Sequence, residues 1–332
     1  MTSFWNQLPK PFFAMAPMKD VTDVAFRTVV ARRGKPDVFW TEFVSADGLS
    51  HAVPSLLRDL QFNKEEHPIV AQIFSSKPEM IAYATKLVAQ LGFDGVDLNM
   101  GCPDRAIEKQ GAGAALMKNP KLAVEIIRAA KEASDLPVSV KTRVGYSKES
   151  LDEWLPILLE AEPAAITIHL RTRKELSLVP ADWELMKKAV AIRNRINPNV
   201  LLIGNGDVGS LEEGRRLAAE TGCDGIMIGR AVFGNPWVFE RISGLRKSSS
   251  EFGFTKSQHS EHGLDEKLEA LLELAQEFEK ITPPKNFSIL KKHIKAFVTG
   301  FSGAAELRAK LMMANNATEL KGLIEMEKGA HQ

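Results

Sequence analysis

The chain has 332 residues, of which 44% are hydrophobic and 26% charged, so it can bury a large core in one or two domains. Lys and Arg total 43 against 42 Asp and Glu, and this balance excludes a global positive charge as the means of binding nucleic acid. Two cysteines are too few for a disulfide framework, no stretch is apolar for long enough to span a membrane, and the amino terminus lacks the pattern of a signal peptide. We therefore expect a cytoplasmic protein without membrane contact.

Short β-rich runs recur along the first three quarters of the chain. They cover residues 12–17, 37–44, 69–74, 95–100, 137–143, 164–170, 199–206 and 225–230. Helical periodicity fills most of the intervals, for example over residues 77–92 and over residues 119–135, where Pro120 stands at a first helical turn. Strands that alternate with helices predict parallel pairing, and eight such units predict closure into a barrel. The predicted fold class is α/β, a (β/α)8 TIM barrel.

The composition changes near residue 245. Residues 245–263 are polar and rich in serine, which is typical of a linker or a long surface loop. From residue 264 onward the pattern is only helical, over residues 264–280, 287–301 and 304–328. We therefore predict a barrel domain at residues 1–244, a linker at 245–263 and a small all-helical C-terminal domain at 264–332.

The residues that close the β-rich runs are candidates for a functional site, because the active sites of such barrels lie at the carboxyl ends of the strands. These residues are polar or conformationally special, and they are Pro17, Met18, Gln72, Asn99, Cys102, Lys141, Arg143, His169, Arg171, Asn205, Gly206, Asp207, Gly229 and Arg230. Singly, Gln72 could satisfy backbone groups and His169 could be a hydrogen-bonded core residue. Lys141 is harder to explain as structural, because an amine inside a β run needs a partner to offset its desolvation. Their convergence on one rim predicts a site.

The last two runs carry glycines that allow backbone amides to approach an anion closely. They lie in "IGNGDVGS" (residues 203–210) and "MIGRAVFGNP" (residues 227–236), the positions at which barrels of this class bind phosphate. No G-x-G-x-x-G sequence opens a helix after a strand, so a separate dinucleotide-binding domain is not indicated. We expect a mononucleotide-like cofactor across the barrel mouth.

Several motifs together resemble one known family, the tRNA-dihydrouridine synthases, flavin enzymes that reduce uridine in transfer RNA. The motifs are "APMKDVTDVAFR" (16–27), "TEFVSADGL" (41–49), "DLNMGCP" (97–103), "GAGAALM" (111–117), "VKTRVG" (140–145), "IHLRTR" (168–173), "NGDV" (205–208) and "DGIMIGRAVFGNPW" (224–237). Order and spacing match over nearly the whole chain. The helical tail is similar more weakly, through "KKHIKAFVTGF" and "ELRAKL". One departure is Leu170, where a glycine is more usual.

The resemblance implies that FMN lies across the barrel mouth and is re-reduced by NADPH or NADH. The residues implied to contact FMN are Pro17, Met18, Gln72, Lys141 and His169 around the ring, with Asn205, Gly206, Asp207, Gly229 and Arg230 around the phosphate. Lys141 is expected on the N1/O2 side of the ring, where an ammonium stabilises reduced flavin. Asn99 and Arg143 are expected to hold the uracil, with Arg171 beside them.

Cys102 is implied to be the catalytic acid, and the chemistry agrees. The C5=C6 bond of uracil is conjugated to the C4 carbonyl, so hydride arrives at C6 and a proton must then reach C5. A thiol, with a pKa of about 8.5, is mostly protonated at neutral pH, whereas a carboxyl, at about 4, is not. A thiol therefore suits a general acid. For Cys223, the expectation is packing near the last strand.

Local positive charge in the tail predicts where RNA binds. Seven basic residues against one acid, Glu306, lie between residues 280 and 310, and they are Lys280, Lys285, Lys291, Lys292, Lys295, Arg308 and Lys310. Lys291 and Lys295 share a helical face. Such side chains could hold tRNA phosphates over the barrel mouth, although an ordinary solvated helix face has the same composition.

Two other functions fit part of the pattern. A flavin barrel acting on a small molecule, such as a dihydroorotate dehydrogenase, also presents an asparagine and a Cys-Pro pair after a strand, but the basic tail and the "IHLRTR" motif argue against it. A non-catalytic RNA-binding barrel would not need Cys102, Lys141 and the phosphate loops together. No protein partner is indicated, and we expect a monomer.

Overall fold

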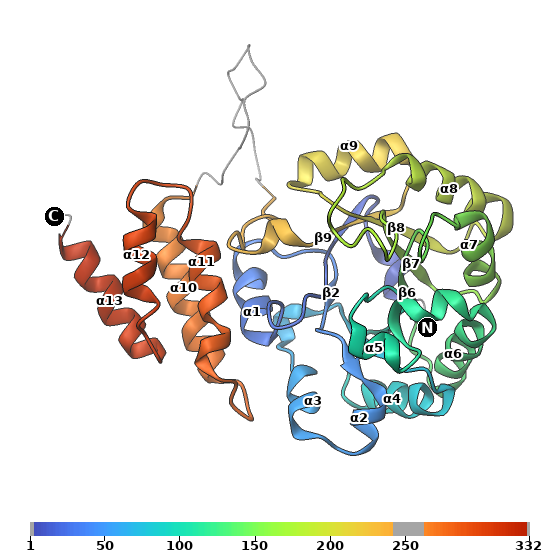
Figure 1. Cartoon of the computed structure of the whole chain (residues 1–332), viewed down its shortest axis with the longest axis horizontal. Coiled ribbons are helices and arrows are strands. Elements are labelled where there is room, and N and C mark those ends of the chain that lie inside the picture. The colour runs from blue at the N-terminus through green and yellow to red at the C-terminus, as the bar shows by residue number, and fades with distance from the viewer. Residues whose placement is uncertain (1–2, 242–261, 331–332) are drawn as a thin grey trace, which may run out of the picture.

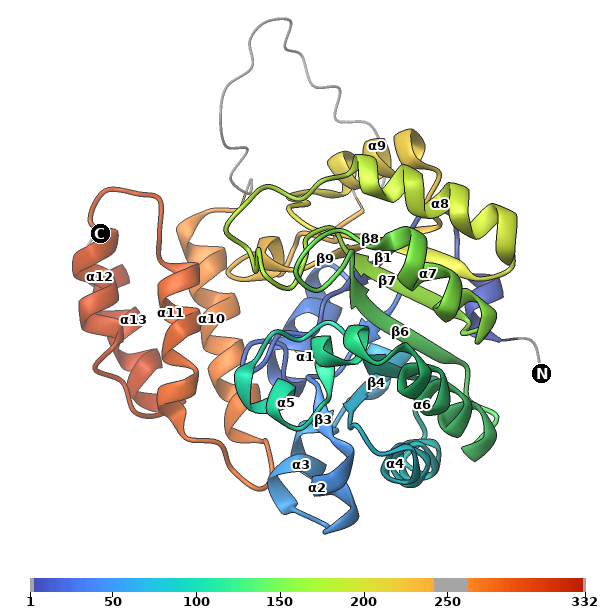
Figure 2. The same ribbon diagram turned by 45° about the vertical axis from the view of Figure 1, so that its right-hand side comes forward.

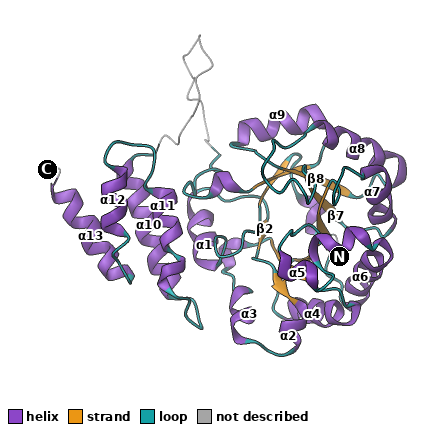
Figure 3. Ribbon diagram, in the orientation of Figure 1, coloured by secondary structure: helices purple, strands orange, loops and turns teal. Residues whose placement is uncertain are grey.

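The structure is a computed structural model that describes residues 3–241 and 262–330. A ring of parallel strands lies at the centre of a ring of helices (Figures 1 and 3). The strands are β1 (Phe12–Met15), β2 (Phe39–Trp40), β3 (Val44–Ser45), β4 (Ile69–Phe74), β5 (Gly95–Asn99), β6 (Val138–Arg143), β7 (Ala165–His169), β8 (Leu201–Asn205) and β9 (Gly225–Ile228). Their order is β1-β9-β8-β7-β6-β5-β4-β2. A parallel bridge between Ala14 and Val38 joins β1 to the chain entering β2. The predicted (β/α)8 barrel is confirmed.

Helices connect the strands and cover the outside of the ring. They are α1 (Val24–Arg33), α2 (Ala46–Ser50), α3 (Pro54–Asp59), α4 (Pro78–Gln90), α5 (Arg105–Lys109), α6 (Pro120–Ala133), α7 (Leu151–Glu160), α8 (Glu184–Ile196) and α9 (Leu211–Thr221). In α6 the side chain of Asn119 caps the amino end by accepting a bond from the amide of Leu122, and Pro120 follows it. The predicted helices over residues 77–92 and 119–135 are confirmed as α4 and α6.

The second β-rich run is interrupted where one strand was expected. Strands β2 and β3 both pair in parallel with β4, but the chain between them leaves the ladder. The hydroxyl of Thr41 accepts a bond from the amide of Gln72 at 3.0 Å, in the place where a regular ladder uses the backbone carbonyl. The irregular backbone gives Glu42 and Phe43 their positions beside the barrel mouth.

Aromatic rings fill the amino-terminal end of the barrel. The 3-10 turn Phe4–Gln7 carries Trp5, which is buried and lies 5.8 Å from Phe12 and 5.9 Å from Trp40, measured between ring centroids. These rings join an interior cluster with residues of β8 and β9, such as Ile203 and Met227. Burial of large rings stabilises this end. Chemistry is thereby left to the opposite, carboxyl end.

A helical region follows the barrel. It consists of α10 (Leu264–Glu279), α11 (Lys291–Phe297), α12 (Ala304–Leu311) and α13 (Ala317–Ala330). In both ribbon views α10 lies beside α1 (Figures 1 and 2), and His293 of α11 is 4.9 Å from Phe26 of α1, measured between ring centroids. Most of the predicted linker at 245–263 lies outside the described residues. The helical run predicted over 304–328 divides into two helices, because Asn316 accepts a bond from the amide of Glu319 and so begins a new helix.

The helical region shares an apolar layer with the barrel. One continuous buried cluster includes Phe26 of α1, Leu271 of α10 and Phe297 of α11. At its edge, Arg32 pairs with Glu273 and Glu277 of α10, both at 2.9 Å. Within the described residues, no helix combines the length and the apolar composition needed to cross a bilayer.

Gly234 permits a close approach between the barrel and the helical region. Gly234 has a φ of +83°, and a Cβ at this position would lie 2.4 Å from the carbonyl oxygen of Ala296 in α11. Such a distance is far below van der Waals contact. This glycine of the "FGNP" sequence therefore serves helix packing, whereas Gly229 of the same segment lines the barrel mouth.

We expect Gly234→Ala to destabilise the protein by about 2–4 kcal/mol, from about 1 for the left-handed backbone and 1–3 for overpacking. The matched control is Gly92→Ala, because Gly92 has a similar φ of +87° but nothing within 4 Å of the added Cβ. Its expected cost is about 1 kcal/mol. Urea denaturation of both variants measures the difference, and equal destabilisation would contradict the packing role.

Candidate active site

A cavity of about 270 Å³ opens at the carboxyl ends of the strands. Every strand-end residue predicted for the site lines it, namely Pro17, Met18, Gln72, Asn99, Cys102, Lys141, Arg143, His169, Arg171, Asn205, Gly206, Asp207, Gly229 and Arg230. Lys291 and Lys295, on α11, are not among its lining residues. The barrel topology thus brings together side chains that are up to 213 residues apart, from Pro17 to Arg230.

Several lining residues were missed by the sequence analysis. They are Ala16, Phe43, Gly101, Pro103, Ser177, Val208, Met227 and Ala231. Phe43 is the most instructive, because it lies inside the "TEFVSADGL" motif yet reads as one more apolar strand residue. Its position depends on the break after β2. Ser177 lies in the loop between β7 and α8, where neither periodicity nor a motif marks it.

The carboxamide of Asn99 shapes the turn that carries Cys102. Its Oδ1 accepts bonds from the amides of Gly101 at 3.2 Å and Cys102 at 2.9 Å. Its Nδ2 donates to Oε1 of Gln72 at 3.0 Å, and Nε2 of Gln72 donates to Asp97 at 2.7 Å. This chain of bonds leads from the barrel interior to the backbone amide of Cys102. Asn99 therefore holds the backbone of the turn on which Cys102 lies.

A glycine of the "GAGAALM" motif packs against the same turn. Gly113 has a φ of +61°, and a Cβ there would lie 2.8 Å from the carbonyl oxygen of Cys102. The amide of Ala114 donates to that oxygen at 3.0 Å. A larger residue at 113 would displace the Cys102 turn, which gives a physical reason for glycine at this place.

The thiol of Cys102 is partly buried, and its pKa is raised. Burial is the main cause, and the carboxylate of Asp104 acts in the same direction, while Arg143 and Lys141 oppose it. A raised pKa favours the neutral thiol, so Cys102 carries its proton at neutral pH. Cys223 is buried behind β9, where its Sγ lies 3.4 Å from the carbonyl oxygen of Gly225.

Lys141 projects from β6 into the cavity. Its Nζ donates to Oδ1 of Asn205 at 3.3 Å, and burial together with the nearby charge of Arg143 lowers its pKa to about 8. Lys141 is still mostly protonated at pH 7. Asp97 opposes this shift, although burial raises its own pKa to about 6. Burial also lowers the pKa of Arg143, to about 10, which leaves it charged.

His169 is a neutral hydrogen-bond acceptor. Burial, reinforced by Lys141 and Arg143, lowers its pKa to about 2. The guanidinium of Arg171 lies 3.1 Å from its Nε2, and since arginine can only donate, this nitrogen accepts. Arg171 is in turn paired with Asp207, which also pairs with Arg230. Asp207 thus places two guanidinium groups at the rim.

The lining of the cavity carries more positive than negative charge. Lys141, Arg143, Arg171 and Arg230 are opposed by the single lining carboxylate of Asp207. Gly206 and Gly229 add backbone without side chains at the same rim. This set of donors fits a phosphate-bearing ligand such as FMN. The fold and the site together define a barrel enzyme with a cationic mouth and a protonated thiol.

Comparison with known proteins identifies the family. The pattern of the dihydrouridine synthase family matches residues 14–331, so the chain belongs to this family of oxidoreductases. A protein of Staphylococcus aureus called a probable tRNA-dihydrouridine synthase is 41% identical over 97% of this chain and 95% of its own. Probable tRNA-dihydrouridine synthase 2 of Bacillus subtilis is also 41% identical, over 97% of this chain and 96% of its own.

Solved structures show a similar fold at low sequence identity. A 2-naphthoyl-CoA reductase in complex with 2-naphthoyl-CoA aligns with 68% of this chain and 49% of its own, with a TM-score of 0.53 and 12% identity. Histamine dehydrogenase from Rhizobium sp. 4-9 aligns with 68% and 44%, with a TM-score of 0.51 and 12% identity. At this sequence identity the likenesses show the fold alone.

We expect the reaction of Cys102 with iodoacetamide to rise with pH around a midpoint above the value of about 8.5 for an ordinary thiol, because burial disfavours the thiolate. The rate is measured by mass spectrometry of the modified peptide. Cys102→Ala reports the contribution of Cys223, and protein unfolded in urea should return to the ordinary value. A midpoint at or below about 8.5 in the folded protein would contradict the raised pKa.

Proposed function

We propose that this enzyme reduces uridine to 5,6-dihydrouridine in tRNA, using FMN held in the barrel mouth and NADPH or NADH as reductant. The observation that carries the proposal is the meeting of Cys102, Lys141 and the cationic rim around one cavity. The names of the relatives support uridine in tRNA as the substrate. In this proposal residues 1–244 perform the chemistry, and residues 264–332 bind RNA.

The cavity lining divides between cofactor and substrate. When bound, FMN would supply a hydride for C6 of the uracil. Its ring would be held by Pro17, Met18, Gln72, Lys141 and His169, and its phosphate by Asn205, Gly206, Asp207, Gly229 and Arg230. The cationic excess favours the phosphate electrostatically. Lys141 keeps an ammonium in the pocket, where it stabilises negative charge.

Cys102 delivers the proton to C5 of the uracil. Its raised pKa keeps the thiol protonated, and Asn99 fixes the backbone that carries it. Arg143 and Arg171 lie on the substrate side. Arg143 is itself held by the carbonyl oxygens of Gly101 at 2.8 Å and Thr172 at 3.1 Å, so its guanidinium is placed before substrate arrives. To enter, the uridine must leave its stacked loop.

We expect Cys102→Ala to retain FMN, and to be reduced by NADPH at nearly the normal rate, while uridine reduction slows by about 100-fold or more, since only general-acid catalysis is lost. Flavin released by acid and identified by chromatography tests the cofactor, and rapid mixing with tRNA tests the second half-reaction. Cys223→Ala is the matched control and should behave as wild type. Recovery of FAD or no flavin, or normal uridine reduction by Cys102→Ala, would contradict the proposal.

Several of the basic residues that were predicted to bind tRNA have partners within the protein. Lys280 pairs with Glu277 at 2.9 Å and Lys310 with Glu327 at 2.7 Å. Arg308 donates to the carbonyl oxygen of Val298 at 2.8 Å. Lys285 is buried against the barrel, so its assignment to an RNA-binding surface was wrong. On α11, Lys295 is exposed and Lys291 and Lys292 are half-buried, which leaves this helix as the proposed contact.

We expect Lys291→Glu with Lys295→Glu to weaken tRNA binding and to flatten its salt dependence by about one unit of slope per lost phosphate contact. Binding isotherms at two salt concentrations measure both effects, and flavin content should not change. The control is Lys321→Glu with Lys328→Glu on α13, where both lysines already lie near carboxylates. Unchanged affinity and slope in the α11 variant would place the RNA elsewhere.

A further inference from the structure

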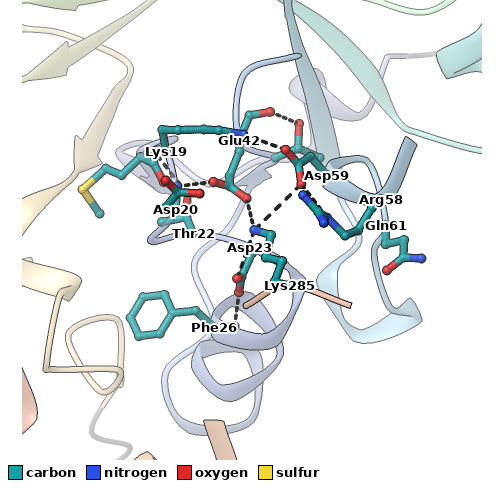
Figure 4. A network of polar contacts seen from close by, with 12 residues as sticks. Lys19, Asp20, Thr22, Asp23, Phe26, Glu42, Arg58, Asp59, Gln61 and Lys285 are labelled. Atoms are coloured by element: carbon teal, nitrogen blue, oxygen red, sulfur yellow. Dashed lines mark hydrogen bonds and ion pairs between the residues drawn. The ribbon is translucent and has the colours of Figure 1, made fainter. Parts of the chain in front are cut away.

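Lys285 belongs to the helical region, but its side chain reaches into the wall of the barrel. It lies between α10 and α11, and its side chain is only 2% exposed. Its Nζ is 3.0 Å from Glu42, 3.2 Å from Asp23 and 3.8 Å from Asp59 (Figure 4). The three carboxylates come from three separate segments of the barrel. One lysine from the tail therefore sits at the centre of an acidic cluster.

The carboxylates of this cluster are buried, so they need the nearby cations to compensate their negative charge. The side chains of Asp23, Glu42 and Asp59 are 5%, 0% and 3% exposed, so water screens them poorly. Asp59 has further cations nearby, since Lys19 lies 2.6 Å and Arg58 3.2 Å from its oxygens. Burial raises the pKa of Glu42, and the positive charge of Lys285 is the main influence that opposes this shift. Removing Lys285 would leave buried carboxylates without sufficient compensation.

The other oxygen of Glu42 holds a turn of the active site. It accepts a bond from the amide of Asp20, a residue in the left-handed conformation with a φ of +56°. This backbone is unfavourable for a residue with a Cβ, so it needs such support. The same turn includes Pro17 and Met18, which line the cavity, and Phe43 next to Glu42 lines it as well. Figure 4 shows Glu42 between Asp20 and Lys285.

We propose that Lys285 is a positioning residue for the active site: through Glu42 it holds the cavity-lining turn at residues 17–20, so that the shape of the pocket depends on the docked helical region. The contacts between Arg32 and α10 also hold the helical region, but they lie at the surface and reach no lining residue. The proposal rests on the proposed function only for its flavin readout.

The test compares Lys285→Met with Arg32→Ala. In the flavin-free protein, Lys285→Met should speed hydrogen exchange of the amides at residues 18–22 by about tenfold, because the turn opens locally. Its affinity for added FMN, measured by fluorescence quenching, should fall by a similar factor. Arg32→Ala removes surface ion pairs with α10 without touching the turn, so it should leave both values near wild type. Lys280→Met, at an exposed lysine of the same region, controls for loss of charge.

Rescue separates positioning from general stability. Lys285→Met combined with Glu42→Gln leaves fewer buried charges and an amide oxygen for Asp20, so exchange at the turn should return most of the way to wild type. Glu42→Ala breaks the link while leaving Lys285 with Asp23, and it should reproduce the fast exchange even if Lys285→Met fails to fold. Unchanged exchange in Glu42→Ala, or an equal effect of Arg32→Ala, overturns the proposal. If wild type binds no FMN, the proposed function fails while the exchange result still stands.

Discussion

The strands of the sheet are all parallel, and the sheet closes into a ring, so the position of the functional residues is set by the direction of the strands. Because all strands run in one direction, their carboxyl ends meet at a single rim. The polar residues at these ends therefore lie around one cavity. Arg143 from β6, His169 from β7 and Asn205 from β8 are distant in the chain but adjacent in register. The amino-terminal end is closed by Trp5 and its neighbours. Chemistry and structure are thus separated along the barrel axis.

The electrostatics of the rim follow from burial. Cations that lose water resist being charged, yet Lys141 and Arg143 remain protonated. Asp97 offsets part of the cost for Lys141, and the carbonyl oxygens of Gly101 and Thr172 offset part of it for Arg143. The same burial acts in the opposite sense on Cys102, whose thiol keeps its proton. His169 is driven to its neutral form. Burial therefore favours neutral Cys102 and neutral His169, whereas Lys141 and Arg143 stay charged although burial lowers the pKa of each.

The helical region contacts turns of the barrel that lie next to the active-site cavity. Gly234 allows α11 to lie against the turn that follows β9, and the buried ion cluster around Lys285 reaches the turn that follows β1. These are neighbouring positions of the barrel, because β1 pairs with β9. The helical region therefore packs directly against two turns at the mouth of the barrel.

Features that depend on residues close together in the chain could be predicted from the sequence. Alternating strand and helix patterns predicted the barrel, and the residues at strand ends predicted most, but not all, of the residues that line the cavity. The partner that each side chain meets became apparent only in the folded structure. Lys285 looked like a surface cation, and only the fold surrounds it with carboxylates from three segments. The family resemblance implies that Asn99 holds the uracil, and the fold adds a contact that the sequence did not indicate, with the Gln72 oxygen on the neighbouring strand. Local spacing determines secondary structure, whereas the environment of a charge is set by groups brought from elsewhere in the chain.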